Sequence, residues 1–188
     1  MSRILNAPTA AGGGTAEEGI PGQRDTERAG MALDRAAVVA LVDRYVEAVD
    51  GRDMRAWADL FAQEASYVVV SRENVERGLP LALVMDHSRD RIEDRVTSVT
   101  KVWAGHINDY WPRHMISNLD VNIDTPSSGG VRANFALFVT EPDEIGSRLL
   151  AVGRYEDQVT LEGGVARFSS KKVVLDTTVL PRYFVYPI

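Results

Sequence analysis

The sequence predicts an α+β fold in which N-terminal helices pack on a curved antiparallel sheet. Three observations support this prediction. Apolar residues recur at helical spacing between residues 33 and 61. From residue 113 onward, apolar and polar residues alternate over long stretches, as they do in half-buried strands. Helices followed by a run of strands are typical of α+β proteins, and helices closing the concave side of such a sheet would form a cone with a pocket.

The first helix is predicted over residues 33–53, where apolar side chains share one face. They are Val38, Leu41, Val42, Tyr45, Val46 and Val49. We expect Gly51 to end this helix in the left-handed conformation. A short second helix follows over 53–61, capped by Asp53, with Trp57, Leu60 and Phe61 pointing inward. Residues 65–74 are predicted as a strand.

A third helix is predicted over residues 83–105, after a break that contains Gly78 and Pro80. In this helix Asp86, Asp90 and Asp94 would form one stripe, with His87 beside the first of them. Carboxylates next to a histidine can build metal or acid–base sites. Arginines at 89, 91 and 95 lie within helical reach of the acids. These neighbours favour a charged helix surface over a site for chemistry.

The remaining chain is predicted to be strands. Residues 113–124 alternate, and one face would carry Met115, Ser117, Leu119, Val121 and Ile123. A turn at 125–130 leads to a strand at 131–141. Two further strands within 147–180 flank a hairpin at residues 162–164.

Composition limits the function. The 188 residues are 45% hydrophobic and 26% charged, which suits a single domain over residues 31–188. Residues 1–30, rich in Gly, Ala, Pro and Thr, are expected to form a disordered tail. The net charge of −6 argues against nucleic acid and anionic membranes as partners. We predict a cytoplasmic protein because the tail lacks the apolar stretch of a secretory signal.

The chain contains no cysteine, which excludes disulfides, thiolate catalysis and cysteine-ligated clusters. We predict no metal site, because the spacing of His106 and His114 fits no ligand motif. A cofactor-free acid–base pocket in the cone is the catalytic alternative. Its candidate lining residues are Tyr45, Tyr67, His114 and Asp157.

Two stretches suggest contact with a partner. Arg72, Glu73 and Asn74 directly follow an apolar run, and arginine is enriched at interfaces. The segment 183–188 is apolar and aromatic. Either a subunit interface or docking within the chain could accommodate this segment.

Three colinear blocks resemble the small (beta) subunits of bacterial aromatic-ring-hydroxylating dioxygenases. They are residues 57–96, 113–123 and 152–181, and the whole match covers about residues 34–181. The third block includes Gly153–Asp157 and, later, Lys171 and Asp176. The match departs from many relatives at His87, where a second acid is common.

The resemblance implies a SnoaL-like, or nuclear-transport-factor-2-like, cone. It also implies a structural, non-catalytic subunit that assembles with large (alpha) subunits and other beta subunits, usually as three alpha plus three beta. The alpha subunit would carry the Rieske [2Fe–2S] cluster and the mononuclear iron, leaving no cofactor, metal or catalytic residue in this chain. The complex would hydroxylate aromatic rings with O2 and NAD(P)H in aromatic compound catabolism, and the stretch 104–114 favours an aromatic carboxylate as substrate.

Ten residues in or near the matching blocks are hypothesised to lie at subunit interfaces. They are Arg72, Glu73, Asn74, Asp94, Arg95, Arg113, Asn118, Tyr183, Phe184 and Tyr186. Two alternatives stay open at this point. One is a free-standing, cofactor-independent cone-fold isomerase or dehydratase. The other is a cone-fold dimerisation module.

Overall fold

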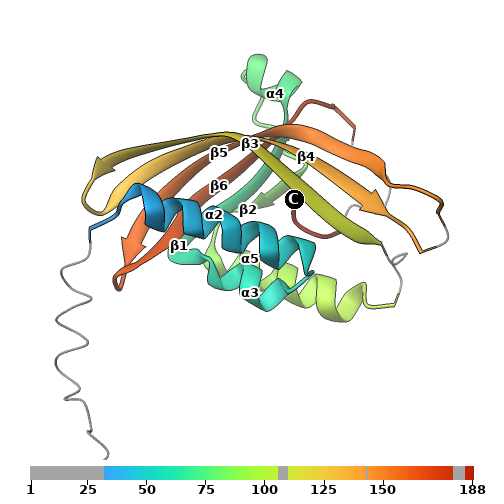
Figure 1. The fold of residues 1–188 in the computed structure, drawn as a ribbon, viewed down its shortest axis with the longest axis horizontal. Helices are drawn as coiled ribbons and strands as arrows, with labels where there is room; N and C mark the ends of the chain where they lie inside the picture. Colours follow the sequence, from blue (N-terminus) through green and yellow to red (C-terminus); the bar gives the residue numbers. More distant parts are fainter. Residues whose placement is uncertain (1–31, 106–109, 143, 180–184) are drawn as a thin grey trace, which may run out of the picture.

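The computed structural model describes residues 32–105, 110–142, 144–179 and 185–188. One six-stranded sheet, in the order β2-β1-β6-β5-β4-β3, curves around three helices. Figure 1 shows α2, α3 and α5 on the concave side of this sheet and α4 on the convex side. The expected α+β architecture of helices on a curved sheet is confirmed. The predicted tail, residues 1–30, lies outside the described residues.

The strands and helices have the following bounds. The helices are α2 (Arg35–Asp50), α3 (Met54–Asp59), α4 (Arg72–Glu76) and α5 (Arg89–Thr97), which continues into a π-helical turn (Ser98–Val102). The strands are β1 (Phe61–Ser71), β2 (Val84–Asp86), β3 (Trp111–Thr125), β4 (Ser128–Thr140), β5 (Arg148–Glu162) and β6 (Val165–Leu175). None of the described helices is both long and apolar enough to cross a membrane.

Helix α2 forms where the apolar periodicity predicts it. The Asp34 carboxylate caps its start by accepting a hydrogen bond from the Ala37 amide at 2.7 Å. The helix ends at Gly51 as predicted, but Gly51 does not take the expected left-handed conformation: its φ is −78°, and Arg52, with φ 55°, is left-handed instead. Because the left-handed residue comes one position later than expected, the Gly51 amide still donates a hydrogen bond to the Glu47 carbonyl.

Helix α3 confirms the predicted cap, since the Asp53 carboxylate accepts hydrogen bonds from the amides of Arg55 and Ala56. Trp57 and Phe61 are buried as predicted, with exposed fractions of 0% and 1%. Their rings meet edge to face at 5.0 Å, which fixes α3 against the start of β1.

The single third helix predicted over residues 83–105 is wrong at its start. Residues 84–86 instead form the edge strand β2, in which Val84 pairs with Val69 and Asp86 pairs with Tyr67. Helix α5 begins only after Ser88, whose hydroxyl caps the Arg91 amide. Backbone hydrogen bonds to β1 hold residues 84–86 in a strand, although the spacing of their side chains also fits a helix.

The strand predicted to run through residue 74 is also wrong at its end. The Ser71 hydroxyl accepts a hydrogen bond from the Asn74 amide and starts α4. On β1 and β6, Val70 and Val174 alternate with neighbours that point inward, so their side chains lie on the convex face. They are nevertheless only 7% and 0% exposed. Helix α4, which contacts both strands, lies over this end of the convex face.

The sheet is antiparallel except at one pair. Strand β1 runs parallel to β6, with Val69 beside Val173 and Ser71 beside Leu175. The hairpin joining β5 and β6 forms as predicted, with Gly163 and Gly164 at positive φ.

Strand β3 does not present the single apolar face that the alternation predicts. Asn118, with φ 52°, lies at a break in the pairing register between Ser117 and Asp120. This irregularity shifts the side-chain alternation by one residue. Met115 is therefore 55% exposed, while Leu119 on the other side of the break packs against the core.

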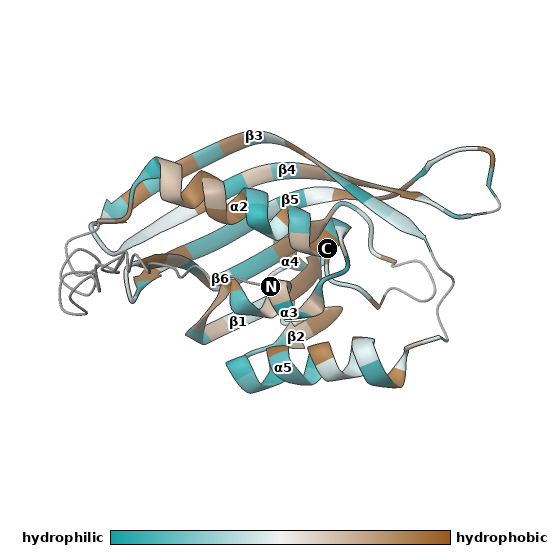
Figure 2. Ribbon diagram, turned by 60° about the horizontal axis from the view of Figure 1, so that its bottom comes forward, coloured by the Kyte–Doolittle hydropathy of each residue, from teal (hydrophilic) through white to brown (hydrophobic). Residues whose placement is uncertain are grey.

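The core fills the space between the helices and the concave face. Figure 2 shows hydrophobic segments on the strands that face α2, and mainly hydrophilic colouring over the first turns of α5. The largest fully buried side chains are Trp57, Tyr45, Tyr67, Tyr155, Phe61, Phe135, Phe168, Lys171, Leu41, Ile92, Leu175 and Ile188. This set contains one lysine ammonium, three tyrosine hydroxyls and one indole N–H. The interior of the cone is therefore unusually polar.

Candidate functional site

A buried ion pair lies at the centre of the cone. Lys171 Nζ donates to Asp157 Oδ2 at 2.9 Å, and both side chains are at most 1% exposed. The second carboxylate oxygen accepts a hydrogen bond from the Lys172 amide at 3.3 Å. Burial raises the pKa of Asp157 and lowers the pKa of Lys171, while each group partly offsets this shift in the other.

Aromatic rings surround the lysine. Its Nζ lies 3.6 Å from the ring centroid of Tyr155, 4.0 Å from that of Tyr45 and 4.9 Å from that of Phe168. Cation–π attraction replaces part of the hydration that the ammonium loses. Asp157 and Lys171 thus form a closed structural pair inside the described core.

The hairpin between β5 and β6 positions this pair. Asp157 lies opposite Lys171 in the register that pairs Tyr155 with Val173 and Gln158 with Ser170, and both side chains are buried on the concave side. On the convex side the neighbouring residues form a second pair, with Lys172 Nζ 2.8 Å from Glu156 Oε2. Our sequence reasoning selected Asp157 and missed Lys171; the doubled charges at 156–157 and 171–172 on one hairpin were the signal available.

A second buried pair joins α2 to β3. Asp50 accepts from the His114 amide at 3.0 Å and lies 2.6 Å from His114 Nδ1. This contact favours the tautomer with the proton on Nδ1. His114 Nε2 has no hydrogen-bond partner among the described residues, and neither has Tyr155 Oη.

Tyr45 and Tyr67 bind the backbone of one residue. Tyr45 Oη donates to the Ile188 carbonyl oxygen, and the Ile188 amide donates to Tyr67 Oη at 2.9 Å. Burial raises the pKa of Tyr67 to about 12 and holds that of Tyr45 well above its usual range, so both hydroxyls keep their protons. For residues 185–188 the structure therefore shows docking within the chain.

The four residues considered for an acid–base pocket are all buried, but they do not share one reactive centre. Tyr45 and Tyr67 hold Ile188, Asp157 holds Lys171, and His114 holds Asp50. Each of the four side chains bonds to another group of the protein, although His114 Nε2 has no partner among the described residues. Among the described residues, no group of three or more His, Asp or Glu side chains could hold a metal ion.

The predicted stripe of Asp86, Asp90 and Asp94 does not exist, because Asp86 lies in β2. Its carboxylate instead accepts from Arg95 Nε at 2.5 Å and from Arg95 Nη2 at 3.2 Å, which ties α5 to the sheet. Asp94 is 72% exposed and lies 3.7 Å from Arg91. Arg95 thus faces the sheet, and Asp94 faces solvent in the described chain.

The other interface candidates are spread over three surfaces. Arg72 pairs with Asp176 at 2.5 Å. Also on α4, Glu73 pairs with Arg77, and Asn74 donates to the Leu81 carbonyl.

Strand β3 and residues near the C-terminal end of the described chain carry the remaining candidates. Arg113 lies 3.5 Å from Asp50, and Asn118 occupies the register break of β3. Tyr186 is half-buried and meets the Tyr110 ring edge to face at 6.0 Å. Tyr183 and Phe184 lie outside the described residues.

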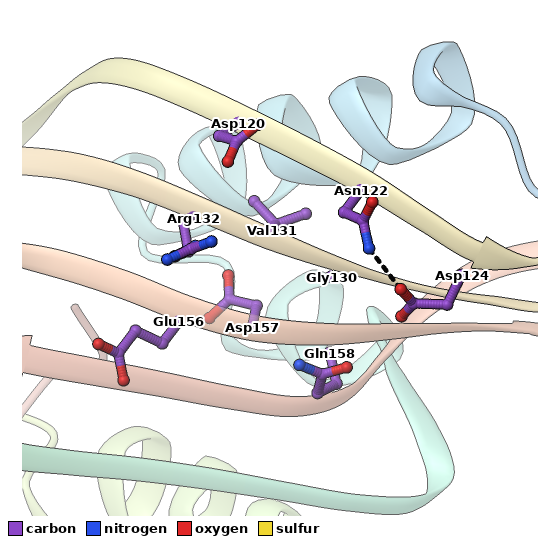
Figure 3. Close-up of a pocket in the computed structure, with 9 residues that line it drawn as sticks. All are labelled: Asp120, Asn122, Asp124, Gly130, Val131, Arg132, Glu156, Asp157 and Gln158. Carbon is purple, nitrogen blue, oxygen red and sulfur yellow. Dashed lines mark hydrogen bonds between the residues drawn. The ribbon is translucent and has the colours of Figure 1, made fainter.

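The convex face of the sheet carries a polar groove of about 370 Å³ (Figure 3). It passes over Gly130 on β4, where the missing side chain leaves a hollow. Its polar lining comes from three strands and comprises Asp120, Asn122, Asp124, Arg132, Glu156, Asp157 and Gln158. Sequence reasoning did not identify this groove, because its members are distant in sequence and come together only through strand register.

Comparisons with known proteins match this chain to one family and to several relatives. The family model for the ring hydroxylating beta subunit matches residues 44–182. The anthranilate 1,2-dioxygenase small subunit of Burkholderia cepacia is 25% identical over 151 residues, covering 80% of this chain and 92% of the relative. A terephthalate 1,2-dioxygenase terminal oxygenase subunit beta 2 from Comamonas is 22% identical, covering 83% and 99%.

A solved structure agrees with these sequence relatives. A chain described as the beta subunit of an aromatic-ring-hydroxylating dioxygenase from Novosphingobium aromaticivorans superposes with a TM-score of 0.72. It is 27% identical, and the match covers 82% of this chain and 96% of that one. The matches span nearly the full length of each of these three relatives.

Proposed function

The chain belongs to the ring-hydroxylating beta-subunit family, and from this premise we propose that it is the non-catalytic small subunit of an aromatic-ring-hydroxylating dioxygenase. The observation that carries the proposal is the family match over residues 44–182. The interior supports it, because the acid–base candidates are buried and bonded to groups of the same chain. The chain then contributes structure to an oxidoreductase complex.

The iron centres of this complex belong to the large subunit. A Rieske cluster needs two cysteines and two histidines, and this chain has no cysteine. The residues present therefore do not fit the cluster. The partner would carry both the [2Fe–2S] centre and the mononuclear iron, and would receive electrons that originate from NAD(P)H.

The assembly we propose contains three large and three small subunits in the cytoplasm. Among the interface candidates, Arg72, Arg113 and Asn118 are the best placed, because all three are exposed at the surface. Arg72 begins helix α4, and Arg113 and Asn118 lie on strand β3. Arg95 is less suited, because it is engaged by Asp86 and only 21% exposed.

The substrate class we propose is an aromatic carboxylate. Two sequence relatives are named for anthranilate and terephthalate, and both compounds carry a carboxylate on a benzene ring. The large subunit would bind this substrate, and the product would be a cis-dihydrodiol or a hydroxylated ring.

Co-expression tests the proposal. A tagged copy of this chain is produced with a candidate large subunit that contains cysteines, and the complex is sized by light scattering. We expect co-purification, with iron and acid-labile sulfide remaining with the large subunit after the chains are separated. Iron bound to the isolated small chain, or ring hydroxylation by that chain alone, would contradict the proposal.

The free-standing enzyme is tested by the same preparation. Turnover of a small hydroxylated compound by the isolated chain, abolished by His114→Gln, would favour a cone-fold isomerase or dehydratase. A stable homodimer that ignores the large subunit would favour the dimerisation module.

A further inference from the structure

Residues 79–85, here called the leucine segment, expose four large apolar side chains at alternate positions. They are Leu79, Leu81, Leu83 and Met85, with exposed fractions of 41%, 60%, 40% and 45%. Single apolar side chains are common at a protein surface. Four of them on one short segment form a continuous apolar strip, which is typical of a surface that another protein covers.

Hydrogen bonds hold the leucine segment in place between α4 and β1. The Leu79 amide donates to the Asn74 carbonyl oxygen at 2.8 Å, and Asn74 Nδ2 donates to the Leu81 carbonyl oxygen at 2.8 Å. The Leu83 amide donates to the Val69 carbonyl oxygen at 2.8 Å. Because the backbone is already fixed, a partner would pay little conformational entropy to order this segment on binding.

The strip lies on the convex side of the sheet, beside α4. In β2, Asp86 points to the concave side, where it bonds to Arg95 of α5, so the neighbouring Met85 points to the convex side. Figure 1 shows α4 on the convex side, and the bonds to Asn74 keep the start of the leucine segment against this helix. The leucine segment and α4 therefore form one continuous surface, which no other described helix covers.

The direction of these side chains distinguishes between two kinds of partner. Strand β2 is the last strand of the sheet, so the β2 strand of a second copy could pair with its free edge. Side chains stand perpendicular to a sheet, so this pairing would leave Met85 pointing into solvent. It would also join only three residues from each copy, which is far below the roughly 800 Å² per partner of a stable interface. The strip instead requires a partner that packs over the convex side.

We propose that the leucine segment and α4 together form the surface on which the large subunit packs, with an apolar face of that subunit covering the four exposed side chains. This inference rests on the proposed function, which supplies the large subunit. It extends the contact proposed for Arg72 on α4 to apolar residues that sequence reasoning did not select. Burial of the strip supplies affinity, and the charge of Arg72 at its polar rim orients the partner.

The first test is co-purification of the full chain carrying Leu81→Asp and Met85→Asp with a candidate large subunit. We expect the yield to fall at least about tenfold, because two carboxylates would be buried against an apolar face. Both positions are exposed, so the Tm of the isolated chain should stay within about 2 °C of the wild type.

The matched control is the chain with Leu149→Asp and Met115→Asp. These side chains are 52% and 55% exposed and lie on β5 and β3, toward the other edge of the sheet. The control changes the same residue types by the same charge. It should co-purify as the wild type does.

A second measurement avoids adding charge. Because the chain has no cysteine, Leu81→Cys gives it a single thiol, whose labelling by a maleimide is followed by mass spectrometry of the small chain. We expect assembly with the large subunit to slow this labelling at least about tenfold, since the rate depends on exposure. Labelling of Leu149→Cys should slow by less than about twofold.

Three results would overturn the inference while leaving the proposed function intact. The first is equal co-purification of the two double variants, whether both yields are high or both are low. The second is equal labelling of Leu81→Cys with and without the large subunit. The third is an oligomer of the isolated chain that Leu81→Asp with Met85→Asp dissociates without affecting co-purification, which would assign the strip to a second copy. Failure of the wild type itself to co-purify would instead overturn the proposed function, and this inference with it.

Discussion

Lys171 illustrates how a charged residue at the centre of the core can be hard to foresee from the sequence. An ammonium group is rarely buried, because it loses its hydration. Here one carboxylate at 2.9 Å and three aromatic rings within 5 Å replace that hydration. Removing only one partner would leave the other charge buried without compensation.

We expect Lys171→Met to destabilise the fold by about 3–5 kcal/mol, because Asp157 would keep its buried charge without a partner. Lys172→Met is the matched control, since the neighbouring lysine pairs with Glu156 at the surface and should contribute only about 0–1 kcal/mol. Urea unfolding of both variants measures the difference. Similar losses for the two would show that the buried pair carries no special weight.

Gly153 gives a second prediction at this scale. A Cβ built there would lie 2.2 Å from the Val174 carbonyl oxygen, which is backbone and cannot move aside. Gly153→Ala should therefore cost about 1–3 kcal/mol or more. Gly130→Ala is the control, because its Cβ would meet the Asp157 carbonyl oxygen at an ordinary 3.6 Å; equal thermal stability of the two variants would contradict this reading.

At the scale of elements, Glu93 links two helices. It accepts from Arg89 Nη2 at 2.7 Å on its own helix and from Arg55 Nη1 at 2.7 Å on α3. Burial raises its pKa, but hydrogen bonds from Arg89 and Arg55 lower it more, so the net shift is below the usual 4.5. A carboxyl group with a lowered pKa in the folded state adds stability above its unfolded pKa.

The contribution of Glu93 should therefore be fully present above pH 4.5 and be lost as the pH falls through the lowered pKa of the folded state. We expect Glu93→Gln to lower the urea midpoint at neutral pH and to reduce its decline in acid. Glu64→Gln, at an exposed carboxylate on β1, serves as the control. A pH profile of Glu93→Gln parallel to that of the wild type would refute the expectation.

Sequence patterns predicted the elements whose partners are local. The periodicity of α2 and the Asp53 cap of α3 depend on neighbouring residues, and both were recovered. Residues 84–86 were assigned to a helix because their pairing with Tyr67–Val69 depends on tertiary contact. The groove over Gly130 and the Asp50–His114 pair likewise depend on contacts between distant segments, for which the sequence holds no local signal.

At the scale of the whole molecule, the proposed assembly predicts that the charge of Arg72 contributes more to binding the large subunit than to folding of this chain. Arg72→Glu should weaken co-purification with the large subunit while changing folding stability by at most about 1 kcal/mol. Arg72 is 46% exposed and pairs with Asp176 at 2.5 Å. Its matched control is Arg148→Glu, since Arg148 is 47% exposed and pairs with Glu141 at 2.6 Å.

Light scattering and pull-down yields compare the two variants with the wild type. Loss of assembly in Arg72→Glu alone would support α4 as part of the interface. Equal assembly of both variants would exclude Arg72 from it, although family membership would stand.

The parallel pairing of β1 with β6 also constrains how the protein forms. Ser66 and Ser170 lie 104 residues apart and bond across this pair. Strand β1 must therefore wait until β6 has been synthesised before its long edge is covered. Non-local pairing of this kind slows folding and prolongs the exposure of apolar strands. During synthesis, the valine-rich edge of β1 is where a chaperone would bind and where aggregation would begin.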